Sequence, residues 1–142
     1  MRESLIEARR WYLQARDDLR AAATLRLGGH FAQGCFFAQQ AAEKGLKAVL
    51  YSQGARVVLG HSARQLAEEC RAHDPTFAGV VPETLLLDQY YIPTRYPNGL
   101  PSPVVPGEFY SLDQAMAAEE AAEKVLGFVE TFLRSKTQAL SD

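Results

Sequence analysis

Apolar residues recur every three or four positions along three long stretches of this sequence, and this spacing constrains the fold more than any other feature. In the first stretch, residues 3–27, the repeat consists of Leu5, Ala8, Tyr12, Ala15, Leu19 and Ala22. Spacings of three and four place side chains on one side of an α-helix. Gly28 and Gly29 follow, and glycine is the usual residue just after a helix end. We therefore expect an amphipathic helix over residues 3–27.

The second stretch, about residues 31–53, is apolar on two sides. One stripe consists of Cys35, Ala38, Ala42, Leu46, Val49 and Leu50, and a strip of mostly small residues lies roughly opposite, at Phe37, Ala41, Gly45 and Ala48. Charged residues are confined to a narrow arc that holds Glu43, Lys44 and Lys47. A helix that is apolar on two sides is usually covered on two sides, so we expect this helix at the centre of the fold.

Two shorter helices and one long helix are predicted in the rest of the chain. Ser62 and Gln65 form a capping-box pattern at the start of a third helix, which ends near residues 72–75. Residues 79–91 predict a fourth piece, which ends before Pro93 because the residue before a proline disfavours helix.

Ser111 predicts the N-cap of a long last helix, whose apolar residues again repeat every three or four positions. No stretch has the pattern of a strand. The sequence therefore predicts a single all-α domain over residues 1–142, an up-and-down bundle of about five helices, three long and two short, with a long loop rich in proline and tyrosine before the last helix.

Composition excludes several classes of protein. The net charge of −2 argues against a general polyanion-binding protein, and two cysteines are too few for a disulfide scaffold. No apolar run approaches the roughly 18 residues of a membrane span, so a cytoplasmic location is expected. No glycine-rich phosphate loop is present, and we expect no cofactor. Cys70 and His73 have a spacing seen in metal sites, but further ligands are not evident nearby, and no metal is expected.

The segment YYIPTRYPNGLPSP, residues 90–103, contains four prolines, three tyrosines and a single charged residue, Arg95. Pro93 and Pro97 restrict the backbone on both sides of Arg95 and reduce the freedom that it would lose on docking. Tyr91 and Tyr96 have rings on which a nucleic-acid base could stack. This loop is long for a compact bundle, which favours a functional role.

Polar residues interrupt the apolar stripe of the second helix. Gln39 lies within the stripe, and a buried amide needs a hydrogen-bond partner. Glu43 precedes Lys47 by four residues, the favourable order for an ion pair on a helix. We interpret Gln39 and Glu43 as a polar pocket that receives the guanidinium of Arg95. The alternative is a polar edge on a core helix.

Three signatures, FAQQAAEKGLKAVL at residues 37–50, HS at 61–62 and YIPTRYP at 91–97, resemble the HEPN family across almost the whole chain. The resemblance implies a bundle of about five helices, a homodimer, nucleotide binding and a small nucleotidyltransferase partner. Dimerisation is also favoured by the second apolar strip of residues 31–53 and by the aromatic loop. We expect the ligand-binding residues to be Arg95, Tyr96, Tyr91, Lys44 and Lys47.

Some branches of the HEPN family are similar to metal-independent ribonucleases, whose signature is an arginine followed, after four to six residues, by a histidine. Leu100, Pro101 and Ser102 occupy the corresponding positions after Arg95. Arg56 and His61 match the spacing, in the loop after the second helix.

The first hypothesis is therefore a non-catalytic module that binds a nucleotide or another phosphate-bearing ligand and acts with a nucleotidyltransferase, of toxin–antitoxin type. The alternative is a ribonuclease toxin that uses Arg95, with His61 as a weaker candidate. The third is a structural homodimer without a ligand.

Overall fold

The computed structural model describes residues 2–141, with side chains described as far as residue 137. The described chain is all-helical and contains no strand. Its elements are α1 (Arg2–Leu27), α2 (Phe31–Ser52), α3 (Ala63–Arg71), the 3-10 helix η1 (Pro75–Val80), α4 (Val81–Asp88), the 3-10 helix η2 (Pro97–Gly99), α5 (Pro106–Phe109) and α6 (Leu112–Ser141).

The predicted all-α bundle is confirmed, and its three long helices begin and end close to the expected residues. The fourth predicted helix differs, because residues 79–91 are divided between η1 and α4, and α4 ends at Asp88. The loop before the last helix also contains a single helical turn, α5. Pro82 and Pro106 each stand at the first or second position of their helices, where proline is tolerated because the missing N–H would have no partner there.

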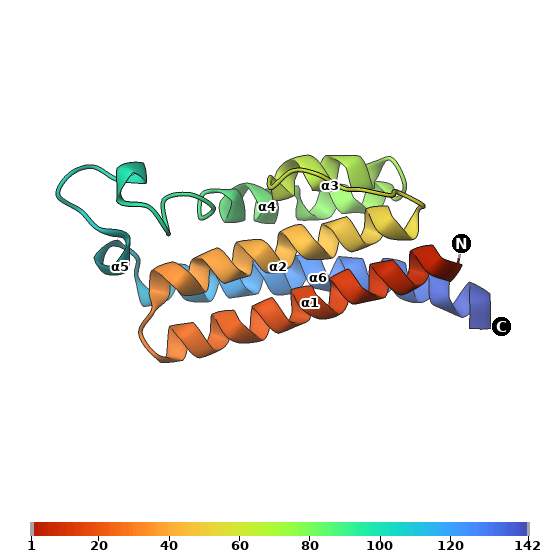
Figure 1. The fold of residues 1–142 in the computed structure, drawn as a ribbon, viewed down its shortest axis with the longest axis horizontal. Coiled ribbons are helices and arrows are strands. Elements are labelled where there is room, and N and C mark those ends of the chain that lie inside the picture. Colours follow the sequence, from red (N-terminus) through yellow and green to blue (C-terminus); the bar gives the residue numbers. More distant parts are fainter. Residues whose placement is uncertain (1, 142) are drawn as a thin grey trace.

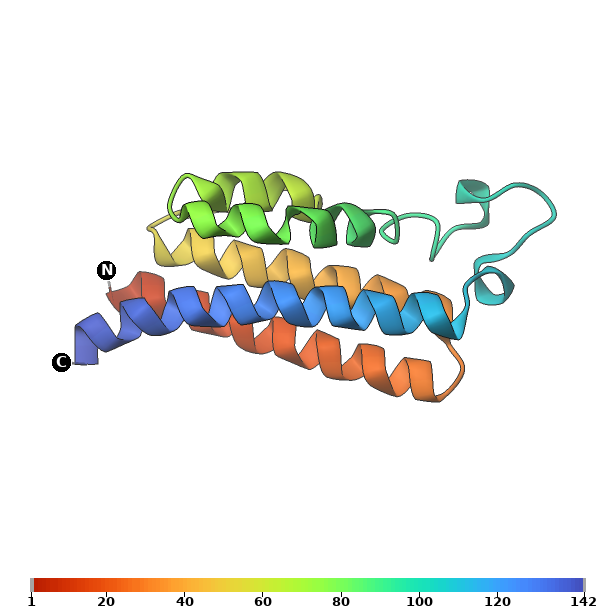
Figure 2. The same cartoon turned by 180° about the vertical axis from the view of Figure 1, so that it is seen from behind.

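Helix α2 lies at the centre of the molecule, as its two apolar sides predicted (Figures 1 and 2). Helices α1 and α6 lie along one side of α2, and the shorter α3 and α4 lie along the other. The described part of the chain begins and ends at the same end of the bundle. The loop that carries α5 extends from the opposite end.

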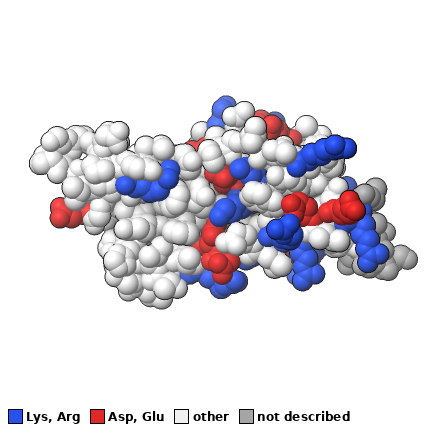
Figure 3. All heavy atoms as spheres, in the orientation of Figure 1, with Lys and Arg blue, Asp and Glu red and all other residues white. Residues whose placement is uncertain are grey.

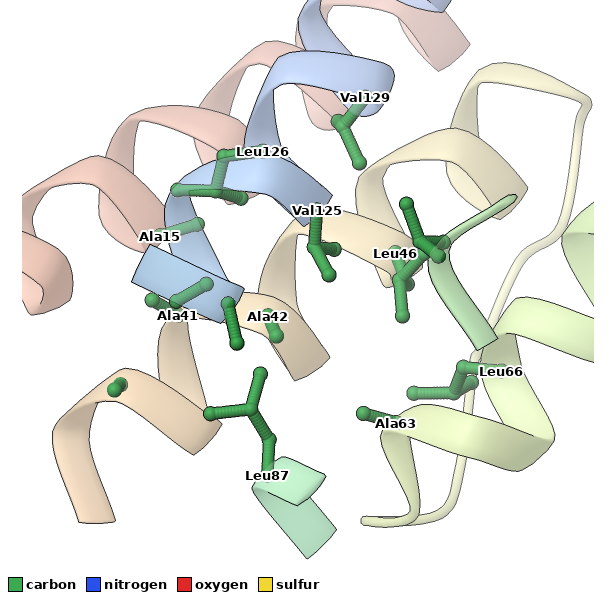
Figure 4. Close-up of a cluster of buried hydrophobic side chains, with 14 of the residues drawn as sticks. Ala15, Ala41, Ala42, Leu46, Ala63, Leu66, Leu87, Val125, Leu126 and Val129 are labelled. Carbon is green, nitrogen blue, oxygen red and sulfur yellow. The ribbon is translucent and has the colours of Figure 1, made fainter. Parts of the chain in front are cut away.

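The core forms where α2 meets α6, α3 and α4. In Figure 4, side chains such as Leu46, Leu66, Leu87 and Val125 point from these four helices into a common centre. On α1, Ala8, Ala15 and Ala22 are fully buried, which allows α1 to approach its neighbours closely.

The small-residue strip of α2 belongs to this interior. Ala41 and Ala48 are fully buried, and a Cβ at Gly45 would stand 2.3 Å from Cδ2 of Leu126 on α6. The strip therefore packs within the chain, and its expected use as a surface for dimerisation is wrong. Sequence spacing revealed a second apolar side but not which partner covers it. Of the helices that the structure describes, none is both long and apolar enough to span a membrane.

Candidate functional site

Arg95 lies in the turn that follows α4, and the backbone of that turn is fixed by local hydrogen bonds. The amide of Arg95 donates to the carbonyl of Ile92 at 3.0 Å. The neighbouring Thr94 is buried, and its hydroxyl donates to the carbonyl of Tyr90. The buried Thr94 therefore anchors the turn on which Arg95 projects.

The exposed guanidinium of Arg95 lies over three aromatic rings, which we call the aromatic platform: Phe36, Tyr91 and Tyr96. The Cζ atom of Arg95 is 4.4 Å, 4.6 Å and 5.1 Å from the centroids of these rings in that order, within the range of a cation–π interaction. Its Nε atom donates to the carbonyl of Tyr91 at 2.8 Å. Among the side chains that the structure describes, neither terminal nitrogen of Arg95 has a hydrogen bond or ion pair.

The surroundings of Arg95 are poor in charge. Figure 3 shows that the end of the molecule that carries the proline-rich loop is largely uncharged on the face drawn, whereas acidic and basic side chains alternate over the rest of that face. The carboxylate that most closely precedes Arg95 in the chain, Asp88, is engaged at the start of α3, where it accepts the amides of Ala63 at 2.8 Å and Arg64 at 3.1 Å. Arg95 is thus a cation held on an apolar surface.

The polar pocket of Gln39 and Glu43 exists, but the prediction that Arg95 enters it is wrong. Both residues are buried, and the segment at His61 occupies the pocket instead. The Nε2 atom of Gln39 donates to the carbonyl of His61 at 2.9 Å, and Nδ1 of His61 lies 3.3 Å from Oε1 of Glu43. Arg95 reaches α2 at Phe36, nearer its start, because aromatic rings there offer the guanidinium a contact that needs no buried acceptor.

His61 and Arg95 contact the same ring. The imidazole of His61 stacks on Tyr91, with centroids 5.0 Å apart and an interplanar angle of 15°. No histidine follows Arg95 in the sequence at the ribonuclease spacing. The fold nevertheless brings His61 to Tyr91, the ring that Arg95 also contacts. Arg56, the other half of the spacing match with His61, is exposed, and no contact joins the two within the described residues.

The two lysines that were expected to bind a ligand are engaged in ion pairs. Nζ of Lys44 lies 2.6 Å from Oδ2 of Asp18 on α1, and Nζ of Lys47 lies 3.2 Å from Oε2 of Glu43. Lys47 is buried and also lies over the ring of Trp11, 5.6 Å from its centroid. Both lysines are therefore occupied by partners within the chain and are not part of the site at Arg95.

Cys70 belongs to the core. Its thiol lies 3.5 Å from the carbonyl oxygen of Leu46, and burial raises the pKa of Cys70 to about 12. A protonated thiol is a poor metal ligand. Within the described residues, no group of three or more histidine, cysteine or acidic side chains could hold a metal ion.

The sequence singled out Arg95, Tyr91 and Tyr96, which the structure brings together, but it indicated neither Phe36 nor the stacking of His61 on Tyr91. The signal available for Phe36 was its position one turn before Gln39, on the face of α2 that the loop approaches. Nothing in the sequence linked His61 to Tyr91, because thirty residues separate them.

Comparisons with known proteins agree on the family of this chain. A family model described as "HEPN domain" matches residues 8–138. A protein of Methanocaldococcus jannaschii named "Putative toxin MJ1304" is 28% identical over 130 residues, which cover 87% of this chain and 86% of that protein.

Solved structures resemble this chain over nearly its whole length. TT1696 from Thermus thermophilus has a TM-score of 0.83 and 38% identity, over 88% of this chain and 97% of that one. ST0689, an archaeal HEPN homologue, has a TM-score of 0.72 and 31% identity, over 89% and 97%. A HEPN domain protein from Thermotoga maritima has a TM-score of 0.69 and 30% identity, over 88% and 98%.

Proposed function

The chain belongs to the HEPN family, and on that premise we propose that it binds a phosphate-bearing ligand, a nucleotide or a segment of RNA, at Arg95 and acts with a nucleotidyltransferase partner in a two-component system of toxin type. Family resemblance supports nucleotide binding and the nucleotidyltransferase partner. The toxin name of the archaeal relative supports the type of system.

The proposal rests on one observation: the side chain of Arg95 is held in place by part of its guanidinium group, and the rest of that group is available to a ligand. Its Nε atom and its flat face are used in contacts that hold it in place, while its two terminal nitrogens have no hydrogen-bond partner among the residues whose side chains are described. Paired guanidinium nitrogens match the oxygens of a phosphate. Tyr96, which is half exposed, lies beside Arg95 and offers a ring for a base.

Binding is tested by fluorescence anisotropy with a labelled single-stranded oligoribonucleotide and by thermal-shift measurements with mononucleotides. We expect Arg95→Ala to weaken binding at least tenfold, because a charge-assisted pair contributes about 1.5–3 kcal/mol. Arg10→Ala is the matched control, since Arg10 is exposed on α1 and its only ion pair within the described residues is with Glu7. Equal loss of binding in both variants, or none in Arg95→Ala, would disprove the proposed site.

Ribonuclease activity is the second candidate, and the position of His61 on the ring of Tyr91 favours it. In this reaction His61 takes the proton of a ribose 2′-hydroxyl while that oxygen bonds to phosphorus and the bond from phosphorus to the 5′-oxygen breaks. The leaving oxygen receives a proton from the imidazolium or from water. Arg95 stabilises the negative charge on the phosphoryl oxygens.

Cleavage is tested by incubating the protein with RNA in the presence of a metal chelator. If the second candidate is right, RNA is cut, and both Arg95→Ala and His61→Ala abolish cutting. Intact RNA in the presence of tight binding supports the non-catalytic module.

A homodimer is also proposed, because apolar side chains remain exposed in the segment between α4 and α6 and on the first turns of α6. Ile92, Tyr96, Val105, Phe109, Leu112 and Met116 are all at least 40% exposed. Light scattering at micromolar concentration tests this, with a monomer as the contrary result. Co-purification with a small nucleotidyltransferase from the same organism tests the partnership.

A further inference from the structure

A groove lies between the first turns of α1 and the part of α6 over residues 130–137, at the end of the bundle opposite the loop that carries α5 (Figures 1 and 2). Its volume is about 580 Å³, which is within the usual range of binding sites. Its apolar part consists of Leu5, Ile6, Tyr12 and Leu133. Ile6 is 57% exposed, so the described chain leaves apolar surface of this groove open to solvent.

The charged side chains that line the groove are mostly basic: Arg2, Arg9 and Arg134, with a single acid, Glu130. Glu130 is already engaged, because Nη2 of Arg134 lies 2.7 Å from its Oε1 atom and Nη2 of Arg16 lies 3.6 Å from its Oε2 atom. Arg2 and Arg9 are exposed, and neither has an ion pair or a hydrogen bond among the side chains that the structure describes. The groove therefore has an excess of positive charge, although the chain as a whole has a net charge of −2.

Arg2 and Arg9 differ in this respect from the other arginines of α1. Each of the others has a carboxylate partner: Arg10 pairs with Glu7, Arg16 with Glu123, Arg20 with Asp17 and Arg26 with Glu119. The two arginines of α1 that lack such a partner among the described residues thus both line the groove. Unpaired cations beside open apolar surface are complementary to an occupant that brings carboxylates and apolar side chains together.

The dimensions of the groove suit a short helix. It follows α1 from Arg2 to Tyr12, which corresponds to about 15 Å at 1.5 Å per residue, the length of about ten helical residues. A helix laid between α1 and α6 contacts both of them, as in other complexes in which an amphipathic helix occupies a groove. Nucleic acid is less complementary, because its phosphates would pair with the arginines but leave Leu5 and Ile6 uncovered.

We propose that this groove is the docking site for a short amphipathic helix of a partner protein, with acidic residues beside its apolar ones. Leu5 and Ile6 receive the apolar side chains, and Arg2 and Arg9 pair with the carboxylates. The inference does not depend on the ligand proposed at Arg95, which lies in the turn after α4.

The probe is a fluorescein-labelled synthetic peptide of about three helical turns, with leucine at every third or fourth position, glutamate beside the leucines and alanine elsewhere. Anisotropy measures its affinity for the full chain. Arg2→Ala/Arg9→Ala should weaken binding about three- to tenfold, the range expected for the loss of two exposed ion pairs. The matched control is Arg10→Ala/Arg20→Ala, which removes the same charge from exposed positions of α1 that do not line the groove.

The apolar part of the groove is tested with a second matched pair of variants. Ile6→Gln should weaken binding of the peptide by at least threefold, because it removes an apolar contact. Leu13→Gln should not, since Leu13 is similarly exposed, at 50%, on the same helix but does not line the groove. Melting temperatures confirm that each variant is folded. In ¹⁵N NMR spectra of the full chain, the peptide should shift amides of residues 2–12 and 130–137.

Equal loss of binding in the two arginine double variants overturns the inference, as does equal binding of a peptide with lysine in place of glutamate. Absence of binding by the acidic peptide overturns it as well. Displacement of the peptide by an RNA oligonucleotide would assign the groove to nucleic acid, and a smaller molar mass of Arg2→Ala/Arg9→Ala in light scattering would assign it to a second copy of the chain; either result excludes the proposed occupant. Failure of the proposed function is recognised separately, because Arg95→Ala should leave binding of the peptide unchanged.

Discussion

At the scale of single residues, the pair of Glu43 and Lys47 shows how burial changes the contribution of an ion pair to stability. On an exposed helix such a pair contributes about 0.3–0.5 kcal/mol. Here the two side chains are 4% and 7% exposed, and Nζ of Lys47 also lies over the ring of Trp11. Removal of one partner would leave the other charge buried without compensation.

We predict that Lys47→Met lowers the free energy of unfolding by about 3 kcal/mol, because Glu43 then remains as an unpaired buried charge. The double variant Glu43→Gln/Lys47→Met should be more stable than the sum of the two single changes predicts, because it removes both charges. Urea unfolding measures each value. Lys124→Met provides the control, since its pair with Glu83 is more exposed and should change stability by less than about 1 kcal/mol. Additive effects would show that the pair is not coupled.

The sequence predicted the order and spacing of this pair, but not its burial or its two further partners, Trp11 and His61. Spacing within one helix says which side chains share a face, and it says nothing about what covers that face. Trp11 comes from α1 and His61 from the loop before α3. The expectation that Arg95 enters this pocket rests on chemical complementarity alone, which does not distinguish a carboxylate pocket from a surface of aromatic rings.

At the scale of elements, the start of α3 is held by a residue from another helix. The amide of Gln65 donates to Ser62 Oγ at 3.1 Å, so the predicted N-cap is confirmed. The carboxylate of Asp88, at the end of α4, accepts from Ser62 Oγ at 2.8 Å and from the amides of Ala63 and Arg64. This contact joins α3 to α4 and fixes the segment that carries His61.

We predict that Asp88→Ala destabilises the protein by about 1–2 kcal/mol, the usual cost of removing a cap, and speeds hydrogen exchange of the first amides of α3. The comparison is Asp17→Ala on α1, an exposed residue whose change should stay within about 0.5 kcal/mol. Unfolding in urea gives the stabilities, and NMR gives the exchange rates. Unchanged exchange at Ala63 and Arg64 would contradict the role of Asp88.

The contact of α2 with α6 depends on the lack of a side chain at Gly45. Helix propensity alone favours alanine over glycine by about 1 kcal/mol. However, a Cβ at Gly45 would stand 2.3 Å from Cδ2 of Leu126, and Leu126 is fully buried. Overlap of this kind typically costs about 1–3 kcal/mol.

Gly45→Ala should therefore lower the melting temperature although it raises helix propensity. Gly127→Ala on α6 is the matched control, because no atom lies within 4 Å of the position its Cβ would take, and it should raise stability by about 1 kcal/mol. Differential scanning calorimetry compares the two. A stabilised Gly45→Ala variant would mean that the side chain of Leu126 moves aside without loss of packing.

At the scale of the whole molecule, the fold was more predictable than the site because helix periodicity is local and the site is not. The long helices α1, α2 and α6 follow from the repeat of apolar residues along each one. The site joins Phe36, His61, Tyr91 and Arg95, from one helix and two loops, and their contacts depend on how the loop before α6 returns to the start of α2. The concentration of tyrosine and proline around Arg95 marked the loop, and the HS and YIPTRYP signatures marked His61 and Arg95 separately, but none of these features showed that the two residues share a ring.

Burial of the two cysteines makes the stability of the whole chain depend on pH in the alkaline range. Cys35 and Cys70 are fully buried, and burial raises the pKa of each thiol from 9.0 to about 12. In the unfolded chain each thiol ionises near its ordinary pKa, whereas in the folded protein it remains protonated. Alkaline pH thus favours the unfolded state, and stability is lost as the pH rises from about 9 toward 12.

We predict that the free energy of unfolding falls by about 1.4 kcal/mol per thiol between pH 8 and pH 10, since one pH unit above the unfolded pKa corresponds to that amount. Urea unfolding at pH 8, 9 and 10 measures the slope. Cys70→Ala should be less stable at pH 8 because it leaves a cavity, yet its stability should depend on pH about half as steeply. The tyrosines with raised pKa, Tyr12, Tyr90 and Tyr110, have an ordinary value of 10.0 and add to the slope mainly at still higher pH. A wild-type stability that is constant from pH 8 to pH 10 would mean that the thiols ionise within the folded core, and that the packing around Cys35 and Cys70 is looser than their burial implies.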